Sequence, residues 1–167
     1  MKRCTAIIVL LILLLCSLPA CQREQEMERP VNFYYRTAEL HYQTDSTVID
    51  AEQRECIRFE NTRQILEHYL QGPQSAALRS PFPAGLRLIS MENDPKLFII
   101  YLSQEFASLT DLDLMIACGC IAHTCMDLTG AECVSIRVDG ALLNGQTEIR
   151  IDRDTLMLLD NCTPKEE

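Results

Sequence analysis

Two apolar runs separated by a short polar stretch form the clearest pattern in this chain. They extend from Leu86 to Met91 and from Leu97 to Leu102, with Glu92-Asn93-Asp94-Pro95-Lys96 between them. Apolar runs of this length, joined by a polar segment that contains Pro, are typical of a β-hairpin. Apolar residues occupy both alternations of each run, so both faces of the hairpin are predicted to be at least partly apolar.

A short helix is predicted just before this hairpin. Asn61 is placed to cap its first turn, with Gln64 three residues later. Gly72 and Pro73 end the helix, because Gly suits the left-handed position after a helix and Pro cannot continue one. The apolar stripe of this helix recurs at helical spacing, at Ile65, Leu66, Tyr69 and Leu70.

The rest of the pattern predicts an α+β domain. A long helix is expected over 111–128, with Asp111 and Asp113 in its first turn and Gly130 after its end. Alternation predicts strands at 31–36, 132–139 and 147–151, with weaker strand signals at 47–49 and 155–159. This order predicts a single domain in which two main helices pack on one face of a mixed or antiparallel sheet. Residues 31–102 and 111–159 show a similar order of elements, which suggests two similar halves.

The first 21 residues have the layout of a bacterial lipoprotein signal. Lys2 and Arg3 precede an apolar run from Ala6 to Leu15, and Leu18-Pro19-Ala20-Cys21 follows. Small residues directly before a Cys resemble a lipobox, in which the Cys thiol carries a diacylglyceryl group. The alternatives are an ordinary signal peptide or an uncleaved anchor.

The domain organisation follows from this signal. Residues 1–20 are predicted to be removed, and Cys21 to be lipidated on the extracytoplasmic face of the membrane. The polar segment 21–30 is predicted to be a tether, because it cannot bury apolar area. Residues 31–160 then form the domain, and 161–167 a polar tail.

The charge of the chain excludes one class of partner. The whole chain carries a net charge of −9, and loss of residues 1–20 leaves 13 basic and 24 acidic side chains, a net charge of −11. Binding to nucleic acid requires a basic face, so nucleic acid is not an expected partner. Anionic lipid headgroups are expected to repel so acidic a domain.

A cluster of cysteines invites a chemical interpretation. Cys118, Cys120, His123 and Cys125 fall within eight residues of the predicted long helix. On a helix, Cys118 and Cys125 lie about 20° apart, whereas Cys120 lies about 160° from Cys118, so the four side chains cannot converge on one ion. Burial as small apolar residues is the favoured interpretation. The alternatives are a disulfide to Cys56, Cys133 or Cys162, and a redox or metal site that needs a loosened helix at Gly119.

Other catalytic patterns are missing from the sequence. There is no nucleophile elbow, zinc-protease motif, P-loop or dinucleotide-binding turn. The three histidines, at 41, 68 and 123, are scattered. No enzymatic activity, cofactor or metal is therefore predicted.

Several motifs resemble the GerMN domain of bacterial sporulation and germination lipoproteins. That family shows a helix that ends in L-x-G-P, a P-x-G before a strand, and a strand that ends in L-S-x-x-F. Residues from about 31 to 159 follow this pattern. The matching motif positions are Gly72, Pro73, Pro83, Gly85, Ser103 and Gly140, together with Leu70, Leu102 and Phe106.

The resemblance implies a scaffold function. Related domains help to place or assemble a complex between two membranes, so we expect an anchored lipoprotein that binds other envelope proteins during sporulation or germination. Two alternatives remain open. One is a redox or metal-binding lipoprotein that uses the cysteine cluster, and the other is a ligand-sensing accessory of a membrane signalling protein.

The apolar hairpin supplies the candidate partner surface. Helices on one face of the sheet cover only one of its two alternations, and an exposed apolar set is typical of a protein interface. The sequence does not decide which alternation is exposed. The candidate residues are Ile89, Met91, Leu97, Ile99 and Tyr101.

Overall fold

The structure is a computed structural model that describes residues 30–38, 48–55 and 61–160. Cys21, the predicted signal and tether, Cys56 and the tail with Cys162 lie outside the described residues. The elements are β1 (Pro30–Thr37), β2 (Ile49–Glu55), α2 (Thr62–Tyr69), β3 (Leu78–Arg79), β4 (Leu88–Asn93), β5 (Leu97–Leu102), the 3-10 helix η1 (Gln104–Ser108), α3 (Asp111–Thr129), β6 (Cys133–Val138), β7 (Ile149–Asp152) and α4 (Arg153–Asp160).

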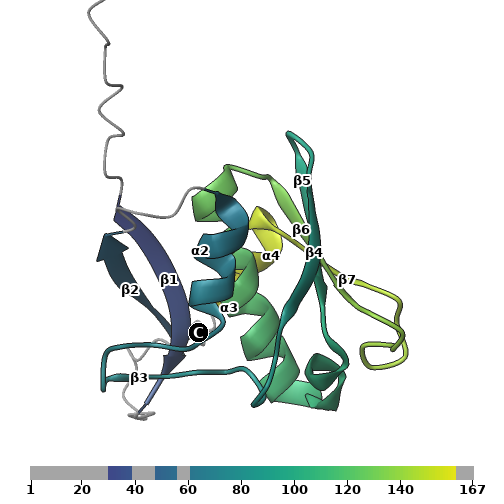
Figure 1. Cartoon of the computed structure of the whole chain (residues 1–167), viewed down its shortest axis with the longest axis horizontal. Coiled ribbons are helices and arrows are strands. Elements are labelled where there is room, and N and C mark those ends of the chain that lie inside the picture. The colour runs from purple at the N-terminus through teal and green to yellow at the C-terminus, as the bar shows by residue number, and fades with distance from the viewer. Residues whose placement is uncertain (1–29, 39–47, 56–60, 161–167) are drawn as a thin grey trace, which may run out of the picture.

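The strands form two sheets, with the helices between them (Figure 1). The smaller sheet has the order β2-β1-β3 and is antiparallel. The larger sheet has the order β4-β5-β6-β7, in which β5 and β6 are parallel and the outer pairs are antiparallel. The α+β class and the single domain with antiparallel and mixed pairing are confirmed. The expectation of one shared sheet needs correction, because β1, β2 and β3 form a sheet of their own.

Burial of α3 on nearly every side explains the second sheet. From Ile116 to Cys125 all its residues are buried except His123. A helix that is apolar all round needs cover on more than one face, and β1 covers the side that the larger sheet leaves open. The helix is long and apolar enough to cross a membrane, yet 61% of its most apolar window is buried within the domain, as in a core helix.

On one edge of β1, side chains from helices bond to the strand backbone in the place of a neighbouring strand. Beside Tyr34, no described strand pairs with this edge of β1, since β3 pairs only with Arg36 and Thr37. The N–H of Tyr34 donates to Thr124 Oγ1 at 3.0 Å, and Tyr69 Oη donates to the Tyr34 carbonyl at 2.9 Å. Both backbone groups of Tyr34 are thereby satisfied, as groups removed from water require.

Local capping signals set the limits of two helices. The side chain of Asn61 accepts from the N–H of Gln64 at 3.0 Å, as predicted for an N-cap. Residues 155–159, predicted as a weak strand, instead belong to α4. Asp152 ends β7 and accepts from both the N–H and the hydroxyl of Thr155, at 2.7 and 2.6 Å, which favours a helical turn.

Candidate functional site: the outer face of the larger sheet

The alternation of β5 separates a buried set of side chains from a partly exposed set. Phe98, Ile100 and Leu102 are buried in the core that contains α3. Leu97, Ile99 and Tyr101 point to the opposite side and are partly exposed. No described helix covers that side, and Figure 1 shows the three helices on the other side of β4–β7.

The register extends this face across all four strands. Ser90 and Glu92 of β4 oppose Tyr101 and Ile99 of β5, so they share its side of the sheet. We call this surface the outer face. From β4 to β7 it consists of Ser90, Glu92, Leu97, Ile99, Tyr101, Cys133, Ser135, Arg137, Arg150 and Asp152.

Three of the five candidate partner residues lie together on the outer face: Leu97, Ile99 and Tyr101. Met91 pairs with Ile100 and packs against the core, so it belongs to the inner side. Ile89 lies at the irregularity in the pairing of β4 with β5 and is 40% exposed. The five residues therefore do not form one surface, because the pairing of Met91 with Ile100 places Met91 on the inner side and the irregularity interrupts the alternation at Ile89.

A chain of polar contacts crosses the middle of the outer face. Tyr101 Oη donates to Glu92 Oε1 at 3.1 Å and accepts from the Arg137 guanidinium at 3.0 Å. The same guanidinium lies 5.6 Å from the centre of the Tyr101 ring. Arg137 also donates two bonds, of 2.9 and 2.6 Å, to one oxygen of Glu148. These contacts link β4, β5, β6 and the segment that leads into β7.

Glu148 is the centre of this network. Besides Arg137, its carboxylate accepts from Ser135 Oγ at 2.8 Å and from Arg150 Nε at 2.8 Å. The Ser135 hydroxyl and the Arg137 guanidinium hold the pKa of Glu148 below its ordinary value. We call Glu92, Tyr101, Arg137, Glu148 and Arg150 the polar ladder.

The chemistry available on the outer face is recognition. Mutual hydrogen bonds hold the Tyr101 and Arg137 side chains in fixed orientations, so little side-chain entropy remains to be lost on binding. Leu97 and Ile99 lie beside them as partly exposed aliphatic groups. Tyr and Arg are the residue types that most often dominate the energetics of protein interfaces.

The cysteine cluster forms no such arrangement. Cys118, Cys120 and Cys125 are buried, and burial raises the pKa of all three thiols, that of Cys118 to about 12. His123 instead stacks on the Tyr34 ring, with 4.7 Å between ring centres. Within the described residues no three metal-ligating side chains are grouped. The interpretation of Cys118 and Cys125 as buried apolar residues agrees with these positions.

The motif residues occupy turns that position the two sheets. Gly72 has φ of 103°, Gly85 of 82° and Gly140 of 67°, values that side-chain-bearing residues rarely adopt. Ser103 is buried, and its Oγ accepts from the N–H of Arg87 at 3.0 Å, which fixes the end of β5 beside the start of β4. Pro73 and Pro83 lie in the loops that flank β3. None of these residues belongs to the outer face.

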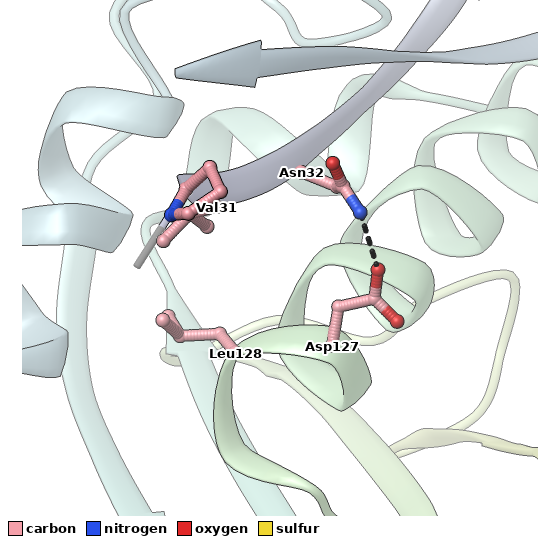
Figure 2. Close-up of a pocket in the computed structure, with 5 residues that line it drawn as sticks. Val31, Asn32, Asp127 and Leu128 are labelled. Carbon is pink, nitrogen blue, oxygen red and sulfur yellow. Dashed lines mark hydrogen bonds between the residues drawn. The ribbon is translucent and has the colours of Figure 1, made fainter. Parts of the chain in front are cut away.

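A shallow hollow lies at the other side of the domain, where β1 begins (Figure 2). It measures about 190 Å³ and is lined by Pro30, Val31, Asn32, Asp127 and Leu128. The Asn32 amide donates to Asp127 at 3.3 Å, as Figure 2 shows, and Tyr34 Oη donates to the same oxygen at 2.9 Å. Both donors bond to one oxygen of the Asp127 carboxylate. These bonds connect β1 to α3, so the polar groups of the hollow have a structural role.

Sequence reasoning missed Arg137 and Glu148, which are central to the outer face. They are eleven residues apart and lie 36 and 47 positions after Tyr101 in the chain. The alternation of β6 places Arg137 on a polar face. That pattern predicts that Arg137 is exposed, but it does not predict which side chains Arg137 contacts. Its contact with Tyr101 depends on the parallel pairing of β5 with β6.

Comparisons with known proteins agree with this architecture. The family model described as "Germane: Sporulation and spore germination" matches residues 32–144. The first GerMN domain of the sporulation protein GerM from Bacillus subtilis superposes with a TM-score of 0.58 at 19% identity, over 75% of this chain and 98% of that domain. The tandem GerMN domains of the same protein give 0.54 at 16% identity, over 75% and 45% of the two chains. No curated protein matches in a sequence search.

At these identities the structural matches establish the fold alone. The family match, however, covers more than half of the chain, and its range includes the motif positions Gly72, Ser103 and Gly140. The chain therefore belongs to the Germane family of sporulation and spore germination proteins, and its domain is GerMN-like.

Proposed function

We propose that this protein is a lipid-anchored, extracytoplasmic lipoprotein that binds another envelope protein through the outer face. Membership in the Germane family supports a role associated with sporulation or germination. The observation that carries the proposal is the outer face itself. It combines partly exposed Leu97 and Ile99 with the polar ladder, and no described helix covers it.

The composition of the outer face favours a protein partner over a small ligand. Neither described hollow of about 200 Å³ involves these residues, and the face follows four strands instead of enclosing a cavity. Small-molecule sites are usually concave and enclosed. A broad face with ordered Tyr and Arg side chains next to aliphatic ones is typical of a protein interface.

Paired variants on β5 test the binding face. Ile99→Asp places a charge on the outer face and should abolish partner binding while the melting temperature stays close to that of the wild type. Ile100→Asp places the same charge in the core, where Ile100 is 1% exposed, and should unfold the domain. The readouts are thermal unfolding, and spore formation and germination in the host.

The outcome that contradicts the binding proposal is specific. If Ile99→Asp folds and supports spore formation and germination at wild-type levels, the outer face is not the functional surface. Tyr101→Ala, which removes a member of the polar ladder without adding a charge, should reproduce the phenotype of Ile99→Asp in weaker form.

The anchor requires a separate test. The signal-like segment and Cys21 motivate it, since a thioether lipid needs the thiol. Cys21→Ser should leave the protein unprocessed or released from the membrane, and detergent-phase partitioning with N-terminal mass spectrometry measures this. An unmodified Cys21 in the native protein would refute the anchor and leave the outer face to be judged by the β5 variants.

A further inference from the structure

β7 is the last strand of the larger sheet, and no described strand pairs with its outer edge (Figure 1). The direction of its backbone groups follows from β6. The N–H of Cys133 donates to the carbonyl of Lys96, just before β5, at 3.0 Å, so Cys133 directs its backbone groups at β5. Because these groups alternate in direction along a strand, Val134 and Ile136 direct theirs at β7.

The edge of β7 that faces away from β6 therefore belongs to Arg150 and Asp152. In the register of the two strands, the β6 residues that face β7 pair with Ile151 and Ile149. The backbone bonds between β6 and β7 use these two isoleucines, so the N–H and C=O groups of Arg150 and Asp152 point outward. Outward backbone groups on an edge strand are a template for pairing with a further strand.

Side chains hinder such pairing at two other sheet edges. β4 pairs irregularly with β5, and its carbonyls accept from Arg63. On β2, the carbonyl of Val48 accepts from β1, so the backbone groups of Ala51 alternate outward, and Asp50 Oδ1 accepts from the N–H of Ala51 at 2.7 Å. Within the part of the chain that the structure describes, no side chain bonds to the N–H of Arg150.

The side chains on this edge carry opposite charges. Arg150 and Asp152 are exposed on the same side of the sheet. Arg150 bonds to Glu148 through Nε at 2.8 Å, so its terminal nitrogens remain able to donate. Asp152 accepts from Thr155 through Oδ1, which leaves Oδ2 able to accept from a guanidinium. Charges on an edge normally hinder an approaching strand, but two opposite charges spaced two residues apart are complementary to an antiparallel copy of themselves.

We infer that β7 pairs with β7 of a second copy of this chain, in an antiparallel ladder that places Arg150 of each copy opposite Asp152 of the other. The outward backbone groups restrict the bonded pairs to these two residues. A register that aligns Arg150 with Arg150, or Asp152 with Asp152, sets like charges opposite each other, which destabilises a sheet. The register centred on Ile151 instead forms two Arg–Asp pairs.

This pairing joins the larger sheets of the two copies and makes their outer faces continuous. The polar ladder ends at Arg150, so a contact with Asp152 of the other copy extends the network from one molecule to the next. The strand ladder is short, because α4 begins at Arg153, and we expect a weak dimer. The inference depends neither on the proposed outer-face partner nor on the proposed anchor.

Charge-swap variants of the full-length chain, purified in detergent, test this inference by analytical ultracentrifugation over a range of concentrations. Arg150→Glu sets like charges opposite each other in both pairs and should raise the dissociation constant of the dimer about tenfold. Asp152→Lys should do the same. An equal mixture of the two variants restores both opposite-charge pairs and should dimerise with about the wild-type dissociation constant. Arg87→Glu, an identical charge change just before β4, is the matched control and should dimerise like the wild type.

The melting temperature of each variant is measured alongside. Asp152 also accepts from Thr155 at the start of α4, so Asp152→Lys carries the risk of unfolding. If it does unfold, Arg150→Pro takes its place. Proline removes the outward N–H of Arg150 but no bond between β6 and β7, as edge strands tolerate, so the domain should stay folded and dimerise about tenfold more weakly.

Four results would overturn the inference: a wild type that is monomeric at every concentration, Arg150→Glu or Arg150→Pro that dimerises as tightly as the wild type, an equal loss in Arg87→Glu, or folded charge-swap variants that fail to associate when mixed. Ile99→Asp separates this inference from the proposed function, because Ile99 lies two strands away from β7 and its replacement should leave the dimer intact. Loss of the dimer in Ile99→Asp but not in Arg150→Glu would show that copies meet through the outer faces instead.

Discussion

Arg54 is the most informative single residue outside the outer face. It is a buried cation, and its guanidinium lies 5.0 Å from the centre of the Phe33 ring. It donates to Glu52 at 2.5 Å and to the carbonyl of Gly72 at 2.8 Å. Glu52 in turn accepts from backbone N–H groups after Pro73. A buried charge needs such partners, and here they attach the loop after α2 to β2.

Gly72 in this loop gives the first prediction. Its φ of 103° lies where L-residues with a side chain are strained, whereas a Cβ would meet Ser80 Cβ at an ordinary distance of 3.5 Å. The cost of Gly72→Ala is therefore one of backbone conformation, about 1–2 kcal/mol in the free energy of unfolding. Urea unfolding measures it, with Gln71→Ala as the control. Equal stability of the two variants would contradict the argument.

Glu148 gives a pH-dependent prediction. Its pKa in the folded protein is held below the ordinary value of 4.5, first by the Ser135 hydroxyl and then by Arg137. A lowered pKa contributes stability that is complete above the ordinary value and is lost as the pH falls through the folded-state value. Glu148→Gln should therefore be less stable than the wild type at neutral pH, and the difference should shrink at pH about 3.

The matched control for this experiment is Glu132→Gln. Glu132 is largely exposed and lies 3.8 Å from Lys96, so its removal should change stability little at either pH. A difference between wild type and Glu148→Gln that stays constant with pH would show that the carboxylate charge does not stabilise the polar ladder.

Among the elements, α3 explains most of the architecture, and its burial also determines which thiols a reagent can reach. Burial raises the pKa of all four described thiols, but Cys118, Cys120 and Cys125 are buried, whereas Cys133 on β6 is partly exposed and can be reached by a reagent. A cysteine reacts only where the reagent can reach its sulfur. At neutral pH, a maleimide should therefore modify Cys133 in the folded protein and reach the three α3 thiols only on unfolding.

Peptide mapping by mass spectrometry assigns the modified cysteines, and metal analysis of the same sample adds a second readout. The buried positions predict no stoichiometric zinc on α3. Rapid modification of Cys120, or zinc that is lost on Cys120→Ala, would revive the redox or metal-binding interpretation.

The strand β4 shows how an exposed sheet edge is protected. Its pairing with β5 is irregular between Leu88 and Ser90, and the Arg63 guanidinium of α2 donates to the carbonyls of Leu88 and Ile89 at 3.3 Å. Irregular pairing and a charged side chain both hinder pairing with a further strand. Recognition through the outer face is therefore better supported than addition of a strand at this end of β4.

For the whole molecule, the decisive contact joins the smaller sheet to α3. Thr124 Oγ1 accepts from the N–H of Tyr34 at 3.0 Å. Thr124→Val should lower the free energy of unfolding by about 1–3 kcal/mol, because a buried donor loses its acceptor. Thr124→Ser keeps the hydroxyl and serves as the control. Urea unfolding compares the two, and an equal loss in both would place the effect in packing.

The antiparallel arrangement of β1 and α3 defines two opposite ends of the domain. The start of β1 lies beside the end of α3, and the end of β1 lies beside the start of α3, since Asn32 contacts Asp127 and Arg36 pairs with Asp113. The outer face runs along the side of the domain (Figure 1).

Local patterns in the chain were enough to predict most elements and their limits. The hairpin of β4 and β5, the helix α3 and the capping at Asn61 depend on residues close in sequence, so periodicity and turn chemistry reveal them. The GerMN motifs were enough to indicate the family, because they too are short local patterns. Gly72 and Gly140 adopt backbone conformations that few other residues tolerate, so they mark the fold directly.

The second sheet, the exposed side of β5 and the polar ladder required the folded chain. Alternation shows that two faces of a strand differ, but burial of Ile100 and partial exposure of Ile99 depend on where α3 packs. The meeting of Tyr101 with Arg137 depends on parallel pairing of strands separated by a helix. Such contacts join residues far apart in the chain, and local sequence carries no record of which distant side chain will face them.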